Sequence, residues 1–498
     1  MASTDAERHS PDERSPLLPP HSPSAPARTR WSPATISYLF LLIIIAGVAA
    51  DGISAPALTR IYEAIYCRQY FAEHDPSLIG RDNVPEKFCK IPAVQGKVAM
   101  LKAWQTFFDA IGSLSLAIPW GWYADSRGRK PVILLTTWSL FARAVWIQIV
   151  CFCWKTLPLK LVWLSAIHSI SGGAPVFSAI AAAVFFRFGA SQLFATFISS
   201  PIAAILMRLG PFVPTVVGIV FWGLMCALVS LIPETKGYSS SKPTSQDLPP
   251  PHVEHSTIGQ RISAISARMR HSTAFLWSDK RITILILAYS VHSLSYNASD
   301  LLIQYVSARF NIPLSRATLI LGLQSALIIV HLLCILPAIT HILTARLRMA
   351  AQLKDLLLAR WSAFFLSLGL FGIGIAPTMP LLIAALPIEV AGWGFTFLTR
   401  SLMTSFVESH HVARLYTVLS LVDTAVLMVG SPVIAALFDR GLSSGSGVAA
   451  GLPFVTCGLV VAAFGAPILF IRVEDGPVEE SDEQEVSVQP ARGGNAEP

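Results

Sequence analysis

The sequence carries little charge for its length. Asp, Glu, Lys and Arg make up 13% of its 498 residues, whereas about 25% is usual in a soluble protein. Hydrophobic residues make up 53%, and the mean hydropathy is +0.57. Because so few polar side chains cannot cover a globular surface, the composition excludes an ordinary soluble protein, and we expect lipid to be the solvent over much of the molecule.

The sequence also lacks a concentrated basic face, although its formal net charge is +7 at pH 7. Lys and Arg are scattered between long apolar runs, without the interleaved aromatic residues of a nucleic-acid surface. We therefore expect no nucleic-acid partner, and we interpret the excess of bases as charge at the inner face of a lipid bilayer.

Motifs for catalysis and cofactor binding are missing as well. No Walker motif, dinucleotide-binding fingerprint or zinc-ligand spacing occurs in the chain. The sequence therefore predicts no enzyme, no cofactor and no metal site.

Cysteine is scarce, and five of the seven cysteines lie inside apolar runs, where packing explains them. Cys67 and Cys89 instead lie in a polar segment, 57–97, which we place outside the membrane. Two interpretations of this pair stay open, namely a disulfide and two unpaired surface thiols.

Apolar runs of about twenty residues are abundant, and each is long enough to cross a hydrocarbon core of about 30 Å. Lipid offers backbone amides no partner and no strand-like alternation is present, so these runs predict helices. The expected fold class is an all-α integral membrane protein with twelve spans in two six-helix halves. The expected spans are 36–56, 98–120, 131–153, 161–184, 188–207, 212–232, 283–305, 317–339, 360–377, 379–399, 413–437 and 450–471.

Polar segments divide the chain into five parts. We expect a disordered cytoplasmic tail at 1–33, an N-terminal six-helix bundle at 34–232, a cytoplasmic linker at 233–281, a C-terminal six-helix bundle at 282–472 and an acidic disordered tail at 473–498. Basic residues in the short loops after the second and eighth spans place both termini in the cytoplasm.

The loop between the second and third spans reads GWYADSRGRK and follows the pattern G-x-x-x-D-x-x-G-R-[RK]. Gly121 and Gly128 allow a tight turn between two helix ends, and Asp125 can pair with a base or a helix N-terminus. Arg129 and Lys130 offer charge to carboxylates on neighbouring helices. Making and breaking such contacts would control a gate.

At this place in a six-plus-six pattern, the motif resembles the signature of the major facilitator superfamily of secondary transporters. The sequence PETKG at 233–237 also resembles the element that closes six-helix halves in that superfamily. The resemblance covers most of residues 36–472 and implies the major facilitator fold and alternating access. Within the superfamily, the chain distantly resembles fungal proteins related to the proton-coupled folate transporter branch; some fungal members export secondary metabolites, whereas the animal branch imports.

Ionisable residues inside the spans are energetically costly, so each suggests a function. Transporters of this architecture bind substrate near the bilayer midplane, between the two halves. An Asp109–Arg143 pair with a purely structural role, an interhelical hydrogen bond at Glu389 and a packed His292 remain open alternatives. The candidate substrate or proton cavity consists of Asp51, Asp109, Arg143, His292, Glu389 and Asp423.

The connection between the fourth and fifth expected spans departs from the family pattern. Arg187 is the only formal charge from Leu161 to Met207, so the usual polar loop of about a dozen residues is missing. Either the short loop is genuine, or residues have been lost and the inner gate is damaged.

The N-terminal tail contains an acidic dileucine pattern, E-x-x-x-L-L, formed by Glu13, Leu17 and Leu18. Sorting adaptors recognise such motifs, which makes a vacuolar or endosomal membrane an alternative to the plasma membrane that we favour.

These features predict a secondary transporter that moves a small-molecule organic substrate by alternating access. Since the sequence shows no ATP site, uphill transport would use an ion gradient, and a proton gradient is favoured because the candidate carboxylates and histidines can titrate. Export of a secondary metabolite or toxicant is favoured. Uptake of an anionic nutrient or folate-like solute remains an alternative, and so does a non-transporting sensor or an inactive truncated transporter. The sequence names neither the substrate nor the direction of transport.

Overall fold

The computed structural model describes residues 32–80, 84–172, 189–232, 279–408, 411–445 and 447–472. Within these ranges the chain is almost entirely helical, and nine helices there are long and apolar enough to cross a membrane. This confirms the all-α membrane class. The count of twelve fits but stays a prediction, because α2 and α8 are long but more polar and the expected span 161–184 is described only to Gly172.

The helices of the first half begin with a long hairpin and end before the expected linker. They are α1 (Pro33–His74), α2 (Pro92–Arg127), α3 (Arg129–Phe152), the 3-10 segment η3 (Leu159–Ser171), α5 (Gly189–Leu209) and α6 (Phe212–Leu231). Two short 3-10 turns, η1 (Pro76–Leu78) and η2 (Glu86–Lys90), connect α1 to α2.

The second half contains several interrupted helices. They are α8 (Lys280–Phe310), α9 (Leu314–Val330), η5 (His331–Ile335), α10 (Leu336–His341), η6 (Ile342–Arg346), α11 (Ala351–Ile375), α12 (Met379–Ala391), α13 (Phe395–Phe406), α14 (Val412–Ser443), η8 (Ala449–Gly451), α15 (Leu452–Gly465) and η9 (Ala466–Phe470). The segments η5 and η6 are π-helical, so the residues from α9 to η6 form one long, locally widened span.

The helix α1 continues beyond the expected end of the first span at residue 56, as far as His74. Ala57, Ile61 and Ile65 recur every fourth residue and are all buried, which gives the added turns an apolar face to pack. Much of the segment 57–97 is therefore a helical hairpin rather than a loop. The lipid-facing surface is rich in exposed large apolar side chains, as the composition requires.

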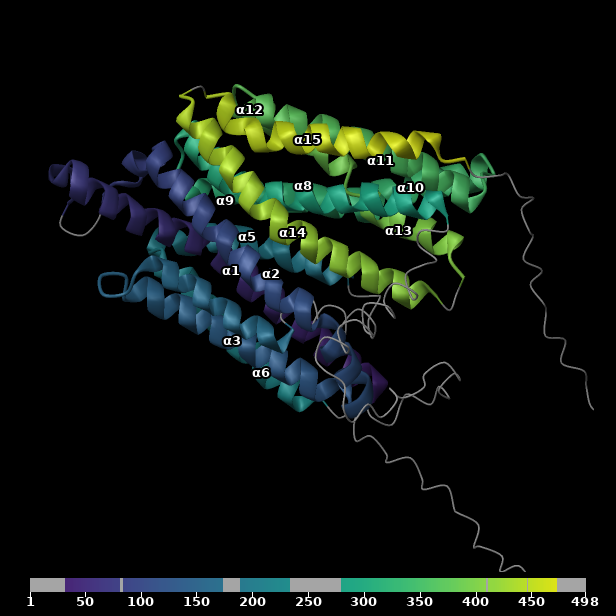
Figure 1. Cartoon of the computed structure of the whole chain (residues 1–498), viewed down its shortest axis with the longest axis horizontal. Helices are drawn as coiled ribbons and strands as arrows, with labels where there is room; N and C mark the ends of the chain where they lie inside the picture. Colours follow the sequence, from purple (N-terminus) through teal and green to yellow (C-terminus); the bar gives the residue numbers. More distant parts are fainter. Residues whose placement is uncertain are drawn as a thin grey trace, which may run out of the picture.

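The two halves make contact mainly through two helix pairs. The helices α2 and α14 lie side by side along much of their length, and α5 packs against α9. Within the halves, α1 packs against α5 and α6, and α11 packs against α12 and α15 (Figure 1). Each half is therefore a bundle of its own, and α2 is the main element that reaches across.

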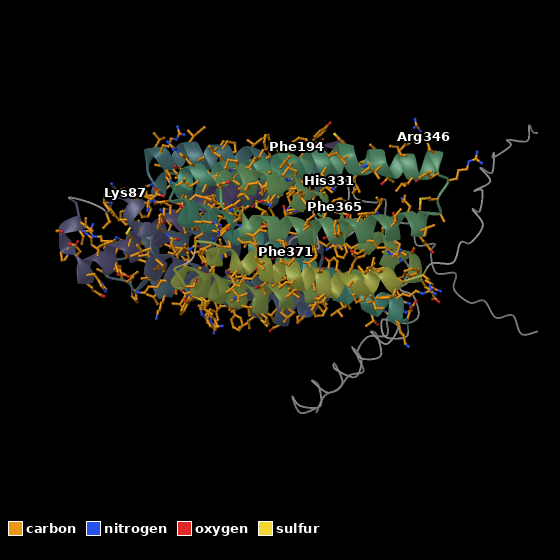
Figure 2. The ribbon with its side chains drawn as sticks, turned by 90° about the horizontal axis from the view of Figure 1, so that it is seen from above. Lys87, Phe194, His331, Arg346, Phe365 and Phe371 are labelled. Carbon is orange, nitrogen blue, oxygen red and sulfur yellow. A yellow bond between two sulfur atoms is a disulfide. The ribbon has the colours of Figure 1, made fainter. Side chains whose placement is uncertain are left out.

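The halves are joined at one end of the molecule and separate at the other. Ala99 and Ala103, near the start of α2, are buried in a core cluster made mostly of second-half residues. Toward the other end, Ala124 belongs to a cluster of first-half residues alone, and Leu285 to a cluster of second-half residues alone, among the residues described. In Figure 1 the two groups of helices run apart toward the right. In Figure 2, Lys87 marks the joined end and Arg346 the open end.

Gly128 forms the turn between α2 and α3 at the open end. Its φ of 104° and ψ of 157° lie in a region that is strongly unfavourable for residues with a Cβ. Its N–H donates to the carbonyl oxygen of Ala124 at 3.1 Å and so ends α2, and α3 begins at the next residue.

We therefore expect Gly128→Ala to lower the free energy of unfolding by ~1–3 kcal/mol, because alanine is strained at this φ. Thermal unfolding of the purified protein in detergent measures this change. Gly447→Ala is the matched control, since a Cβ at Gly447 meets no atom within 4 Å. Equal melting temperatures for the two variants would contradict the assignment of strain to Gly128.

Candidate functional site: charged residues between and within the halves

The gate motif lies at the open end of the molecule. Gly121 and Asp125 belong to the last two turns of α2, whereas Arg129 and Lys130 begin α3. Gly121 is thus helical, and Gly128 alone makes the turn. The side chain of Asp125 lies outside the described part of the structure, as do the dileucine motif, Arg187 and the linker residues 233–278.

The first half presents an ion pair inside the bundle. Arg143 Nη2 on α3 donates to Asp109 Oδ2 on α2 at 2.7 Å, and the two side chains are 27% and 21% exposed. His168 Nδ1 on η3 lies 4.0 Å from Asp109 Oδ1. Asp109 Oδ1 and Arg143 Nε have no hydrogen-bond partner among the described residues. The pair therefore keeps polar atoms free for a further group.

Charges extend from this pair toward the second half. The Asp51 side chain on α1 is attracted electrostatically by Arg143 and repelled by the like charge of Asp300 on α8. Asp300 in turn interacts with Lys102 on α2. Asp300 lies within α8, and its interaction partners Lys102 and Asp51 belong to the other half. The sequence analysis did not select Lys102.

A second polar cluster lies within the second half. Tyr289 Oη donates to Asp423 Oδ2 at 2.7 Å, and Ser293 Oγ donates to Asp423 Oδ1. Arg400 Nη2 lies 3.5 Å from Asp423 Oδ2 and also donates to Tyr289 Oη. The structure thus gives Asp423 a cation that the sequence analysis did not assign to it.

Glu389 is the most buried of the candidate residues, with 1% of its surface exposed. Its Oε1 accepts from Trp393 Nε1 at 2.7 Å, and its Oε2 accepts from Gln324 Nε2 at 3.1 Å. Gly369 of α11 approaches so closely that a Cβ there would lie 2.2 Å from the Glu389 backbone nitrogen. No basic side chain forms an ion pair with Glu389 in the part of the chain described. Glu389 therefore lies among α9, α11 and α12, inside the second half.

The histidines within the second half occupy different settings. His292 Nδ1 lies 2.8 Å from Thr396 Oγ1, and its ring stacks on Phe395 and meets Trp393 edge-on. His331 is buried beside an apolar cavity of about 210 Å³ lined by residues of α9, η5, α10, α11 and α12. Its Nε2 has no hydrogen-bond partner among the residues that the structure describes. Within the described ranges, no three His, Cys, Asp or Glu side chains are grouped as metal ligands would be.

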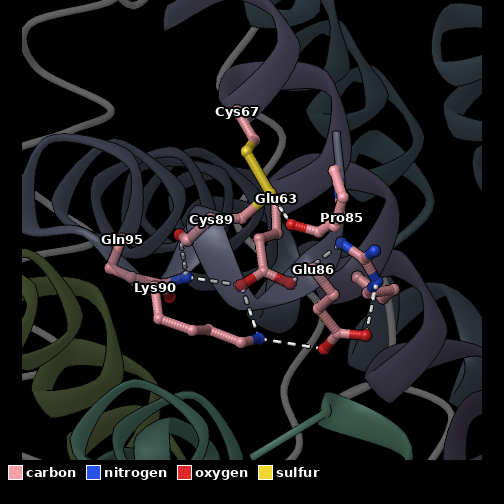
Figure 3. Close-up of a disulfide and its surroundings, with 8 residues drawn as sticks. Glu63, Cys67, Pro85, Glu86, Cys89, Lys90 and Gln95 are labelled. Carbon is pink, nitrogen blue, oxygen red and sulfur yellow. Dashed lines mark hydrogen bonds and ion pairs between the residues drawn. A yellow bond between two sulfur atoms is a disulfide. The ribbon is translucent and has the colours of Figure 1, made fainter. Parts of the chain in front are cut away.

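The joined end contains the cysteine pair. Cys67 on α1 and Cys89 on η2 form a disulfide, with their Cα atoms 5.3 Å apart (Figure 3). Beside it, Glu63 Oε1 accepts from Lys90 Nζ at 2.6 Å and from Gln95 Nε2 at 2.6 Å. The disulfide thus fixes η2 to α1 next to a buried carboxylate.

Comparison with known proteins identifies the family, although no family model matches the chain. The chain is 32% identical over 503 residues to the MFS-type transporter aprT of Aspergillus flavus, covering 95% of this chain and 97% of that one. The chain belongs to the major facilitator superfamily. It is also 27% identical to the MFS efflux pump atnC of Emericella nidulans, with 95% of each chain covered. The chain is therefore a secondary transporter and not an enzyme.

Solved structures show the same fold at low sequence identity. The nucleoside transporter NupG superposes with a TM-score of 0.55 at 11% identity, covering 87% of this chain and 98% of that one. The human organic anion transporter MFSD10 superposes with a TM-score of 0.54 at 15% identity, again covering 87% and 98%. The more specific likeness to the folate transporter branch stays a prediction.

We expect the Asp109–Arg143 pair to contribute ~1–2 kcal/mol of coupling free energy, because each single change leaves a partly buried charge without its partner. A double-mutant cycle of Asp109→Asn and Arg143→Gln, followed by thermal unfolding in detergent, measures this coupling. Lys155→Gln, at an exposed position, is the control for loss of a positive charge. Strictly additive single changes would show that the pair contributes nothing to stability.

Proposed function

We propose that this protein exports a small organic molecule from the cell through a cavity between the two halves, using the proton gradient. The observation that carries this proposal is that Asp300 of the second half interacts electrostatically with Lys102 and Asp51 of the first half, beside the Asp109–Arg143 ion pair. Two relatives that are named efflux pumps support the direction of transport.

We assign the open end to the cytoplasm. Basic residues in the short loops support this orientation, since Arg129 and Lys130 lie at the open end and Arg346 lies there too (Figure 2). The disulfide at the joined end agrees with it, because disulfides persist on the oxidising, outer side of a membrane. The structure then corresponds to an inward-facing state, with the cavity closed from outside and ready to accept a molecule from the cytoplasm.

Glu389 is our candidate for the proton-carrying group. A buried carboxylate without a cation is energetically costly, and a bound proton removes that cost. The two neutral donors Gln324 and Trp393 orient the carboxyl group in either protonation state. Asp109 is less suited to this role, because it already forms an ion pair with Arg143 at 2.7 Å. In this assignment Asp109 and Arg143 contact the substrate, and Asp125 helps to control the inner gate.

The export proposal predicts that a compound accumulates inside cells that lack the gene. Mass spectrometry of cell extracts and medium, with and without the gene, measures this. Asp109→Asn and Asp125→Asn should each lower export at least about tenfold while the protein remains in the membrane, because charged contacts at a binding site or gate are lost. A compound left unused in the medium when the gene is absent would support uptake instead. No difference for any compound would support the sensor or inactive transporter.

The proton assignment predicts that Glu389→Gln abolishes uphill transport but leaves exchange of substrate between the two sides. Glutamine has nearly the same shape but cannot take up and release a proton. Export driven by a pH gradient and exchange at equal pH, both measured in proteoliposomes with the identified compound, separate the two effects. Equal loss of both would indicate that Glu389 is structural, and full retention of gradient-driven export would remove it from the proton pathway.

The plasma membrane is the location that we propose, with sorting adaptors as partners if Glu13, Leu17 and Leu18 act as a signal. Fluorescence microscopy of the tagged protein with and without Leu17→Ala and Leu18→Ala distinguishes surface from vacuolar or endosomal membranes.

A further inference from the structure

The joined end contains a continuous polar network. It begins on α8 of the second half, passes through side chains of the first half and ends on α9 of the second half. Gln304 Nε2 on α8 donates to the Gln95 carbonyl oxygen at 2.7 Å, and Gln95 Nε2 on α2 donates to Glu63 on α1. Lys90 Nζ lies 2.6 Å from Glu63 Oε1 and 2.9 Å from Glu86 Oε1. These side chains are drawn in Figure 3, apart from Gln304.

The network ends on a backbone group of the other half. Glu86 Oε1 on η2 accepts from the backbone N–H of Leu314 at 2.7 Å. Leu314 is the first residue of α9, so this N–H is one of those that a helix leaves without an internal partner. A carboxylate at this position also meets the positive end of the helix dipole.

We propose that Glu86 is a latch that closes the outer gate by holding the first turn of α9, and that the network behind it transmits the contact to α1 and α2. This inference rests on the proposed alternating access. The disulfide between Cys67 and Cys89 keeps η2 on α1, so that the latch moves with the first half. Opening toward the outside requires the Glu86–Leu314 and Gln95–Gln304 contacts to break, because each joins one half to the other.

The surroundings of Glu86 keep its carboxyl group charged. Burial acts to raise its pKa, but the positive charges of Arg60 and Lys90 and the Leu314 N–H outweigh burial and lower the pKa below its ordinary value. Arg60 and Lys90 each form an ion pair with both Glu86 and the neighbouring carboxylate of Glu63, so the two cations connect the two carboxylates. Arg60 and Lys90 stay beside Glu86 when the latch opens, because α1 and η2 belong to the same half, so of these groups only the Leu314 N–H is lost on opening. Loss of that donor raises the pKa of Glu86, so the latch is strongest where Glu86 is ionised and weakens as falling pH protonates the carboxylate.

The test measures access to the closed region, and it needs neither a substrate nor transport. Ala99 is 3% exposed in the core that joins the halves. In Ala99→Cys protein reconstituted in nanodiscs, both faces are open to a hydrophilic maleimide, and mass spectrometry of the peptide containing residue 99 measures its labelling rate. Denatured protein gives the rate for full access.

We expect Glu86→Ala to raise the labelling rate at residue 99 about tenfold, the change that corresponds to a loss of about 1.4 kcal/mol from the closed state. Glu73→Gln, which removes an exposed carboxylate from the same end of α1, is the control and should leave the rate unchanged.

A change at the other partner tests the same bond. Leu314→Pro removes the N–H at the first position of a helix, where proline is well tolerated, and Pro313 before it has ψ of 143°, which is compatible with a following proline. Leu314→Ala keeps the N–H and removes at least as much side chain.

If the latch is correct, Leu314→Pro raises labelling about tenfold and Leu314→Ala much less, because only the proline removes the donor. The latch is overturned if Glu86→Ala and Leu314→Pro label no faster than Glu73→Gln and Leu314→Ala. It is also overturned if residue 99 labels at the denatured rate in the parent protein. If the parent protein shows this gating but exports no compound in the cell experiment above, the proposed function fails and the latch stands.

Discussion

One constraint governs this structure: an ionisable side chain within a spanning helix must meet a partner or the space between the halves, because lipid solvates no charge. Asp109 meets Arg143, and Asp423 meets Arg400 together with neutral hydroxyl groups. Glu389 meets only neutral donors among the described residues. The three carboxyl groups therefore differ in what stabilises their charge, and this difference is the basis on which we propose a substrate-binding role for Asp109 and a proton-carrying role for Glu389.

The helix α2 links the two ends of the molecule. It starts beside the disulfide, buries Ala99 and Ala103 against the second half, and ends at Gly128 in the turn of the gate motif. At its far end, Ala124 packs with the first half alone, among the described residues. The helix α2 thus takes part in the contact between the halves at the joined end and packs within the first half at the open end. A rotation of the first half must change both ends together, which is what alternating access requires.

The sequence predicted the membrane class, the family and the turn at Gly128, since these depend on composition, run length and a local motif. It did not predict the helical extension of α1, because Arg60 and Glu63 resembled loop residues until their partners were known. Arg60 Nη1 lies 3.1 Å from Glu63 Oε2, and the i, i+3 spacing of this pair is visible in the sequence. The second cation beside Glu63, Lys90, comes from η2, and the sequence does not show that η2 packs there. Arg400 was missed for the same reason: its partners lie on α8 and α14, and a single sequence does not reveal which helices face each other.

The positions along α2 and α8 connect the cavity to the outer closure. Gln95 and Lys102 are seven residues apart on α2, and Asp300 and Gln304 are four residues apart on α8, so each pair lies on one helix face. The Lys102–Asp300 interaction therefore lies closer to the open end than the Gln95–Gln304 contact does. The two are separated by about 10 Å along α2 and about 6 Å along α8. A charged substrate group that replaced either partner would weaken the attraction between α2 and α8 next to the proposed latch. Substrate binding would then be coupled to opening of the outer gate directly through the facing sides of α2 and α8.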